Sequence, residues 1–221
     1  MKHNIKIVIT LVKICYSISF MVILAFIVGI SSVSEIGAAM DANVALLAII
    51  FCADTFEQEL QANRWEVFYI LPARSKYLTI CQRILVQIAY LILLISIGYW
   101  VFFWHKPAGL ITGNEMLLYV TTILACAVSA FFFAILSITL VNLFHNLWAG
   151  IGATLTVWFL MNPTFQNKIS LPKYIDIFRY QNSADGWVDY LSSAKLTAVI
   201  TAILLLILNY RLIIKGKERF R

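Results

Sequence analysis

One run of 52 residues, positions 116–167, contains no aspartate, glutamate, lysine or arginine, and it constrains the fold more than any other feature. A helix needs about 20 apolar residues to cross the roughly 30 Å of hydrocarbon in a bilayer. The run is therefore long enough for two crossings. Three polar residues mark the expected turn between them: Asn142, His145 and Asn146.

The composition of the whole chain indicates an integral membrane protein. Of its 221 residues, 62% are hydrophobic and 13% are charged, whereas a typical soluble domain is about 25% charged. This excludes disordered chains and disulfide-stapled secreted modules. The net charge of +6 is attributed to basic cytoplasmic loops, and no nucleic-acid partner is expected.

Other uncharged runs predict further crossings and give an all-α, polytopic membrane protein of one domain. Residues 14–34 form a run of 21 uncharged residues, and residues 84–105 form one of 22. The six expected spans cover residues 14–34, 36–53, 84–104, 116–141, 144–161 and 194–214. Lys195 and Arg211 lie near the ends of the last span, from which they can extend to the interface.

Residues 36–53 are the least clear of these spans, because they include Asp41 and leave an uncharged stretch of only 12 residues. The loop that follows carries four basic residues: Arg64, Arg74, Lys76 and Arg83. Without a crossing here, this basic loop would lie opposite the basic N-terminus, against the positive-inside rule. Six spans with both termini inside place 12 of the 17 basic residues on the cytoplasmic side.

Two segments lie outside the expected spans. In the cytoplasmic segment 54–83, four apolar residues recur at roughly helical spacing: Phe56, Leu60, Val67 and Leu71. The pattern ends at Pro72 and predicts a short amphipathic helix, which either lies on the bilayer or docks onto a partner. Residues 162–193 are expected to form an extracellular cap with short amphipathic helices, because 32 residues are long for a plain connection.

Within the spans, small and amide side chains are expected to pack and hydrogen-bond between helices. The small residues form one stripe: Cys126, Ala130 and Ala134. The amides are Gln87, Asn142 and Asn209. We interpret both sets mainly as contacts inside one bundle.

No catalytic motif is evident in the sequence. A phosphate-binding loop, GxxxxGK[ST], is missing, since the one Gly-Lys pair, at 216–217, has no upstream glycine at the required spacing. Glu57 and Glu59 with His145 suggest an intramembrane protease, but the glutamates lie in a surface loop and no HExxH occurs. The clear spans carry no ionisable residue at their centres, which argues against an ion-driven carrier.

The order of these segments resembles a type-2 ABC exporter permease. The likeness in residues is concentrated in Phe-Glu-Gln-Glu-Leu at 56–60, Leu-Pro-Ala-Arg-Ser-Lys-Tyr at 71–77, and Arg83. In that family a carboxylate-bearing helix leads to a Leu-Pro turn, basic residues and an arginine before the third span. By this resemblance the chain, at 221 residues, would be a small member of the family, and no large extracellular domain is expected.

The resemblance implies a coupling helix that contacts separately encoded ATP-binding cassette ATPase subunits. Its expected coupling residues are Phe56, Glu57, Glu59, Leu60, Arg64, Leu71, Pro72 and Arg74. ATP and Mg would be held by the partner ATPase, so no cofactor or metal is expected on this chain and it is not expected to be an enzyme itself. A second permease chain, identical or related, would complete the export path in a bacterial plasma membrane.

Three other functions stay open. One is a six-span substrate-binding component of an uptake transporter, which would need convergent polar residues on the outer side. Another is a membrane-embedded hydrolase or protease, and the third is an immunity or assembly factor. The sequence does not select among lipid, drug, peptide and polysaccharide as cargo.

Overall fold

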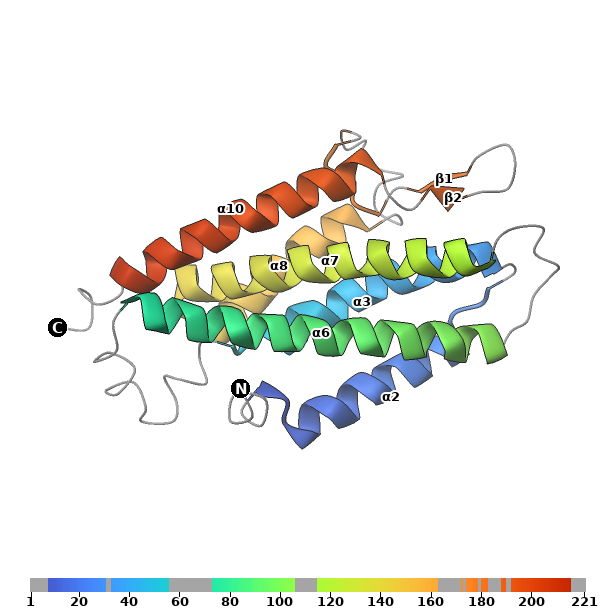
Figure 1. Cartoon of the computed structure of the whole chain (residues 1–221), viewed down its shortest axis with the longest axis horizontal. Coiled ribbons are helices and arrows are strands. Elements are labelled where there is room, and N and C mark those ends of the chain that lie inside the picture. Colours follow the sequence, from blue (N-terminus) through green and yellow to red (C-terminus); the bar gives the residue numbers. More distant parts are fainter. Residues whose placement is uncertain are drawn as a thin grey trace.

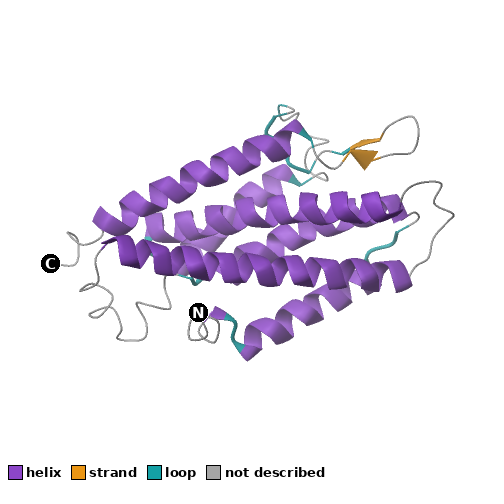
Figure 2. Ribbon diagram, viewed as in Figure 1, coloured by secondary structure: helices purple, strands orange, loops and turns teal. Residues whose placement is uncertain are grey.

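The computed structural model describes residues 8–30, 33–55, 73–105, 115–162, 172, 174–178, 180–182, 188–189 and 192–215. Their main elements are six helices: α2 (Leu11–Ile27), α3 (Ile36–Ala53), α6 (Ala73–His105), α7 (Glu115–Phe144), α8 (Leu147–Met161) and α10 (Ser193–Lys215). A 3₁₀ turn, η1 (Val33–Glu35), precedes α3. Strands β1 (Gln181–Asn182) and β2 (Val188–Asp189) pair antiparallel, with Gln181 opposite Asp189 (Figure 2).

The six helices alternate in direction along one bundle (Figure 1). Helices α2, α6 and α8 begin at the end that we call the proximal end, where α3, α7 and α10 finish. The opposite end, which carries the β1–β2 pair, is the distal end. Thr55 and Ala73, the described residues on either side of segment 56–72, both lie at the proximal end.

Helices α3 and α7 form the centre of the bundle. In α3, 67% of the 18-residue apolar window is buried, compared with 28% in the window of α10. Helix α3 packs chiefly against α7, and α7 also contacts α6, α8 and α10. The largest fully buried side chains include Phe51, Phe102 and Phe133. Cys126, Ala130 and Ala134 are buried in α7, which confirms that this small-residue stripe packs inside the bundle.

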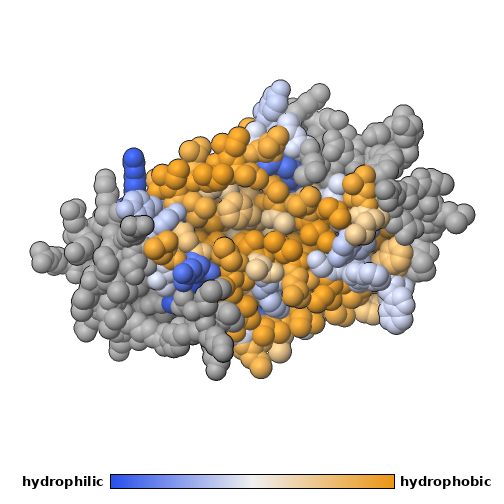
Figure 3. All heavy atoms as spheres, viewed as in Figure 1, coloured by the Kyte–Doolittle hydropathy of each residue, from blue (hydrophilic) through white to orange (hydrophobic). Residues whose placement is uncertain are grey.

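The outer surface of the bundle is strongly apolar. Among the described residues, four helical stretches are long and apolar enough to cross a membrane: Ile36–Ala53, Tyr77–Trp104, Met116–Phe144 and Ser193–Leu212. Helices α2 and α8 are shorter apolar helices of 17 and 15 residues. A hydrophobic band covers the middle of the visible face, with hydrophilic residues nearer both ends (Figure 3). The prediction of a helical, apolar bundle is thus confirmed, and the described residues hold four of the six expected membrane-spanning helices at sufficient length.

The bounds of α3 match the expected span, whereas α6 begins before its expected span. Helix α3 covers residues 36–53, as expected, and tolerates Asp41 in its second turn. Helix α6 begins at Ala73, whereas the third span was expected from residue 84. The expected start came from the last basic residue, Arg83, but that residue is buried in the continuous helix.

A tight hairpin joins α7 to α8. His145 adopts a left-handed backbone conformation, with φ 53°, and reverses the chain. Asn146 caps α8, because its Oδ1 accepts hydrogen bonds from the backbone N–H groups of Trp148 and Ala149 at 2.9 and 3.3 Å. The predicted turn therefore forms at His145 and Asn146, while Asn142 lies inside α7.

Gly150 lets α8 pack closely on α7 just after this turn. A Cβ atom at Gly150 would lie 2.4 Å from Val141 Cγ2 and 2.5 Å from Val141 Cα. The second contact is with backbone, which cannot rotate away. At Gly152, two residues further on, nothing lies within 4 Å of the position that a Cβ atom would take.

Candidate functional site

The predicted coupling residues fall almost entirely outside the described part of the chain. Only Arg74 lies within it, in the first turn of α6. Seven others are outside: Phe56, Glu57, Glu59, Leu60, Arg64, Leu71 and Pro72. The coupling helix therefore stays a prediction, and the described residues that adjoin it become informative.

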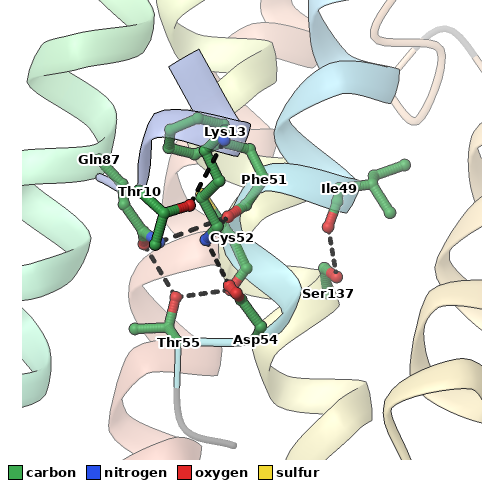
Figure 4. A network of polar contacts seen from close by, with 9 residues as sticks. All are labelled: Thr10, Lys13, Ile49, Phe51, Cys52, Asp54, Thr55, Gln87 and Ser137. Carbon is green, nitrogen blue, oxygen red and sulfur yellow. Dashed lines mark hydrogen bonds and ion pairs between the residues drawn. The ribbon is translucent and has the colours of Figure 1, made fainter. Parts of the chain in front are cut away.

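A polar network lies at the proximal end, where residues 56–72 leave α3 (Figure 4). We call Lys13, Phe51, Asp54, Thr55 and Gln87 the proximal network. Lys13 Nζ donates to Asp54 Oδ1 at 2.5 Å and to the Phe51 carbonyl at 2.8 Å. The Lys13 side chain is 8% exposed and that of Asp54 is 29% exposed, so one end of this ion pair stays accessible to water.

The same network also ties α3 to α6. Thr55 Oγ1 donates to the Cys52 carbonyl at 2.6 Å or to Gln87 Oε1 at 2.8 Å. Gln87 Nε2 donates to the Phe51 carbonyl at 3.4 Å, which confirms that Gln87 bonds between helices. The last two described residues before position 56 are therefore fastened to α2 and to α6.

A second polar group, largely buried, lies between the distal parts of α3 and α10 and the middle of α7. We call Asp41, Ala125, Ser129, Tyr180 and Lys195 the distal cluster. Lys195 Nζ forms an ion pair with Asp41 Oδ2 and donates to Ser129 Oγ at 2.5 Å and the Ala125 carbonyl at 3.2 Å. Tyr180 OH donates to Asp41 Oδ2 at 2.5 Å.

The distal ion pair corrects the expectation that Lys195 extends to the interface. The side chain of Lys195 is only 3% exposed and that of Asp41 is 0% exposed. Lys195 turns inward because Asp41 on α3 supplies a compensating charge inside the bundle, which a solitary buried ammonium would lack. Arg211, at the other end of α10, is exposed.

One aromatic ring, that of Phe178, lies over the ammonium of the distal cluster. The Phe178 ring centroid lies 5.8 Å from Lys195 Nζ, within range of a cation–π contact. Phe178 itself stacks on Phe133 of α7, with centroids 5.8 Å apart and planes 2° from parallel. The described residues around 178 thus cover the ion pair with apolar surface.

The hydrogen-bond capacity of the distal cluster is used unevenly. The three ammonium hydrogens of Lys195 have three acceptors. Asp41 Oδ2 receives both donors, and Asp41 Oδ1 has no hydrogen-bond partner among the described residues although it is buried. A carboxylate with one unsolvated oxygen loses hydration that its single ion pair only partly replaces.

A neutral clamp joins α7 and α10 nearer the proximal end. Asn142 Nδ2 donates to Asn209 Oδ1 at 3.0 Å, and Asn209 Nδ2 donates to Thr139 Oγ1 at 2.6 Å. All three side chains are buried. The prediction that Asn142 and Asn209 bond between helices is confirmed, and we call the three residues the amide clamp.

The remaining candidate for chemistry is His145, which lies exposed at the α7–α8 hairpin. The described residues contain no group of three or more His, Cys, Asp or Glu that could hold a metal ion. Comparisons of the chain with protein-family models, curated proteins and solved structures found no match. Function is therefore inferred from the residues and geometry of this chain.

Proposed function

We propose that the chain is the membrane-spanning subunit of an ATP-driven exporter of the type-2 ABC class, coupled to separately encoded ATP-binding subunits. The observation that supports this most is the alternation of six apolar helices, which brings both ends of segment 56–72 to one end of the bundle. In this proposal all six helices cross a bacterial plasma membrane. The exposed apolar side chains face lipid.

The proximal end is assigned to the cytoplasm by its basic residues. The described residues near this end include six lysines and arginines: Lys13, Arg74, Lys76, Arg83, Arg211 and Lys215. The described residues near the distal end include Lys195 alone, and it is neutralised by Asp41. The positive-inside rule favours this orientation.

The proposed mechanism starts at segment 56–72. ATP-driven closure of the partner ATPase pair, which holds ATP and Mg, pushes on this segment and moves the bundle of each of two permease chains. The push enters the described structure at Asp54 and Thr55. Because these residues bond to Lys13 of α2 and Gln87 of α6, the proximal network makes the three helices respond together.

A six-span substrate-binding component of an uptake transporter is the second candidate. The distal cluster favours it, because polar groups from α3, α7 and α10 converge there. However, nearly all of these groups bond to each other, leaving only Asp41 Oδ1 for a ligand within the cluster. The exporter is therefore the preferred proposal.

The proposal expects the adjacent reading frame to encode an ATPase with a phosphate-binding loop, and co-purification with that ATPase tests the proposed function. The wild-type chain in detergent should retain the ATPase, and a Glu59→Ala, Leu60→Ala variant should lose most of it. The matched control is Tyr174→Ala, an exposed distal residue, which should retain wild-type association. Equal association of all three proteins would show that segment 56–72 is not the coupling helix.

A further inference from the structure

We propose that the distal cluster is a latch that keeps the distal end of each bundle closed and separates when the transporter opens outward. This inference rests on the proposed function, because it assigns an opening motion to the distal end. The charged members of the latch are Asp41 of α3 and Lys195 of α10, and Ser129 of α7 also bonds to the ammonium.

The latch joins four segments that are far apart in the sequence. Asp41 and Lys195 are 154 positions apart, yet their ion pair connects the distal parts of α3 and α10. The ammonium also bonds to two groups on α7, and Tyr180 adds the segment that precedes β1. Separation of any one of these segments from the others breaks a bond to a buried charge.

The two ends of α10 are held by different chemistry. Near the proximal end the amide clamp joins α10 to α7 through neutral groups. Near the distal end the contact is an ion pair with almost no exposed surface. Charges regain far more hydration than amides when water reaches them, so water favours parting of the distal end over the proximal end.

The cover over the latch is small. Ile177 and Phe178 are 2% and 1% exposed, and the Tyr174 carbonyl accepts a hydrogen bond from Thr197 Oγ1 of α10 at 2.5 Å. Residues 174–178 consist of turns without regular secondary structure. They can therefore follow α10 outward without breaking a helix or a sheet.

Two native cysteines provide matched reporters of this motion. Cys126 follows Ala125 in α7 and lies one turn before Ser129, whereas Cys52 lies beside the proximal network in α3. Both are fully buried. Variants that keep only Cys126 or only Cys52, with the other cysteines replaced by alanine, report separately on the distal and proximal ends.

The test measures labelling by a water-soluble maleimide of the purified complex with its ATPase in detergent, where the reagent reaches both ends of the bundle. With MgATP, Cys126 should label about tenfold faster than without nucleotide, because labelling follows the population of the open state. Cys52 should label at one slow rate in both conditions. A nucleotide-independent rate at Cys126, in a complex that has co-purified with its ATPase, would overturn the latch.

Charge variants separate a latch from a pair that only supports folding. Asp41→Asn leaves Lys195 without its counter-ion, so Cys126 should label faster even without nucleotide. The swapped variant Asp41→Lys, Lys195→Asp restores opposite charges and should return labelling to nucleotide dependence. If Cys52 becomes reactive together with Cys126 in Asp41→Asn, that variant has unfolded. The latch is then tested by the nucleotide dependence of Cys126 labelling in the swapped variant and in the wild type.

The proposed function and the latch can fail separately. Loss of co-purification by the wild-type chain would overturn the exporter and, with it, the latch as a gate. Intact co-purification with Cys126 protected in every nucleotide state would overturn the latch and leave the exporter in place.

Discussion

Gly150→Ala should destabilise the bundle because it inserts a methyl group between α7 and α8. The added Cβ would lie 2.4–2.6 Å from the Cγ2, Cα and backbone N atoms of Val141. Non-bonded carbon atoms prefer separations of about 3.5–4.0 Å, so the two helix backbones must move apart by about 1 Å. Overpacking of this kind costs about 1–3 kcal/mol, and it acts next to the hairpin that orders both helices.

Gly152→Ala is the matched control for this prediction. It makes the same chemical change in the same helix, but nothing lies within 4 Å of the added atom. Alanine is favoured over glycine in a helix by up to about 1 kcal/mol, so this variant should be neutral or slightly more stable.

Unfolding in mixed micelles by increasing SDS, followed by tryptophan fluorescence, measures both variants against the wild type. The expected order of unfolding midpoints is Gly152→Ala at or above wild type, and Gly150→Ala clearly below it. Equal midpoints for the two variants would refute the close α7–α8 approach at Gly150.

Three further predictions use the same unfolding measurement. His145→Gly should raise the midpoint and His145→Val lower it, because a left-handed backbone at φ 53° costs a non-glycine residue about 1–2 kcal/mol; equal midpoints would contradict this. Asn209→Leu breaks both hydrogen bonds of the amide clamp and should lower the free energy of unfolding by about 0.6–1.7 kcal/mol. An unfolding midpoint equal to that of the wild type would show that the clamp does not contribute to stability. Lys195→Met should lower the free energy of unfolding by about 3–5 kcal/mol, because it leaves a fully buried carboxylate unpaired. Lys13→Met should lower it by less, because the Asp54 side chain is 29% exposed and stays hydrated. The reverse order would contradict the burial of the distal pair.

The helical architecture could be predicted because long uncharged runs and the positive-inside rule act over whole segments. Residues 36–53 form one helix despite Asp41, as the charge balance of the loops required. The start of α6 could not be predicted in this way. A helix continues past the apolar run wherever its residues pack, and Arg83 is buried within α6.

The distal cluster was missed because its partners are far apart in the sequence. No periodicity links Asp41 to a lysine 154 positions later, and each charge alone resembles an ordinary residue near the end of a span. The signal that was available is the pair of opposite charges, each beside an apolar run, since ionisable residues in such runs pair with one another. Gln87, Asn142 and Asn209 were predictable because buried amides need partners.

Cross-linking from residue 60 to the ATPase tests the central claim most directly. A Leu60→Cys variant, in a chain without its native cysteines, carries a short bifunctional reagent at the predicted coupling helix. Tyr174→Cys carries it at an exposed distal position and serves as the control. The proposed function predicts a cross-linked product with the ATPase from residue 60 and none from residue 174. A product from neither position, or from residue 174 alone, would contradict it.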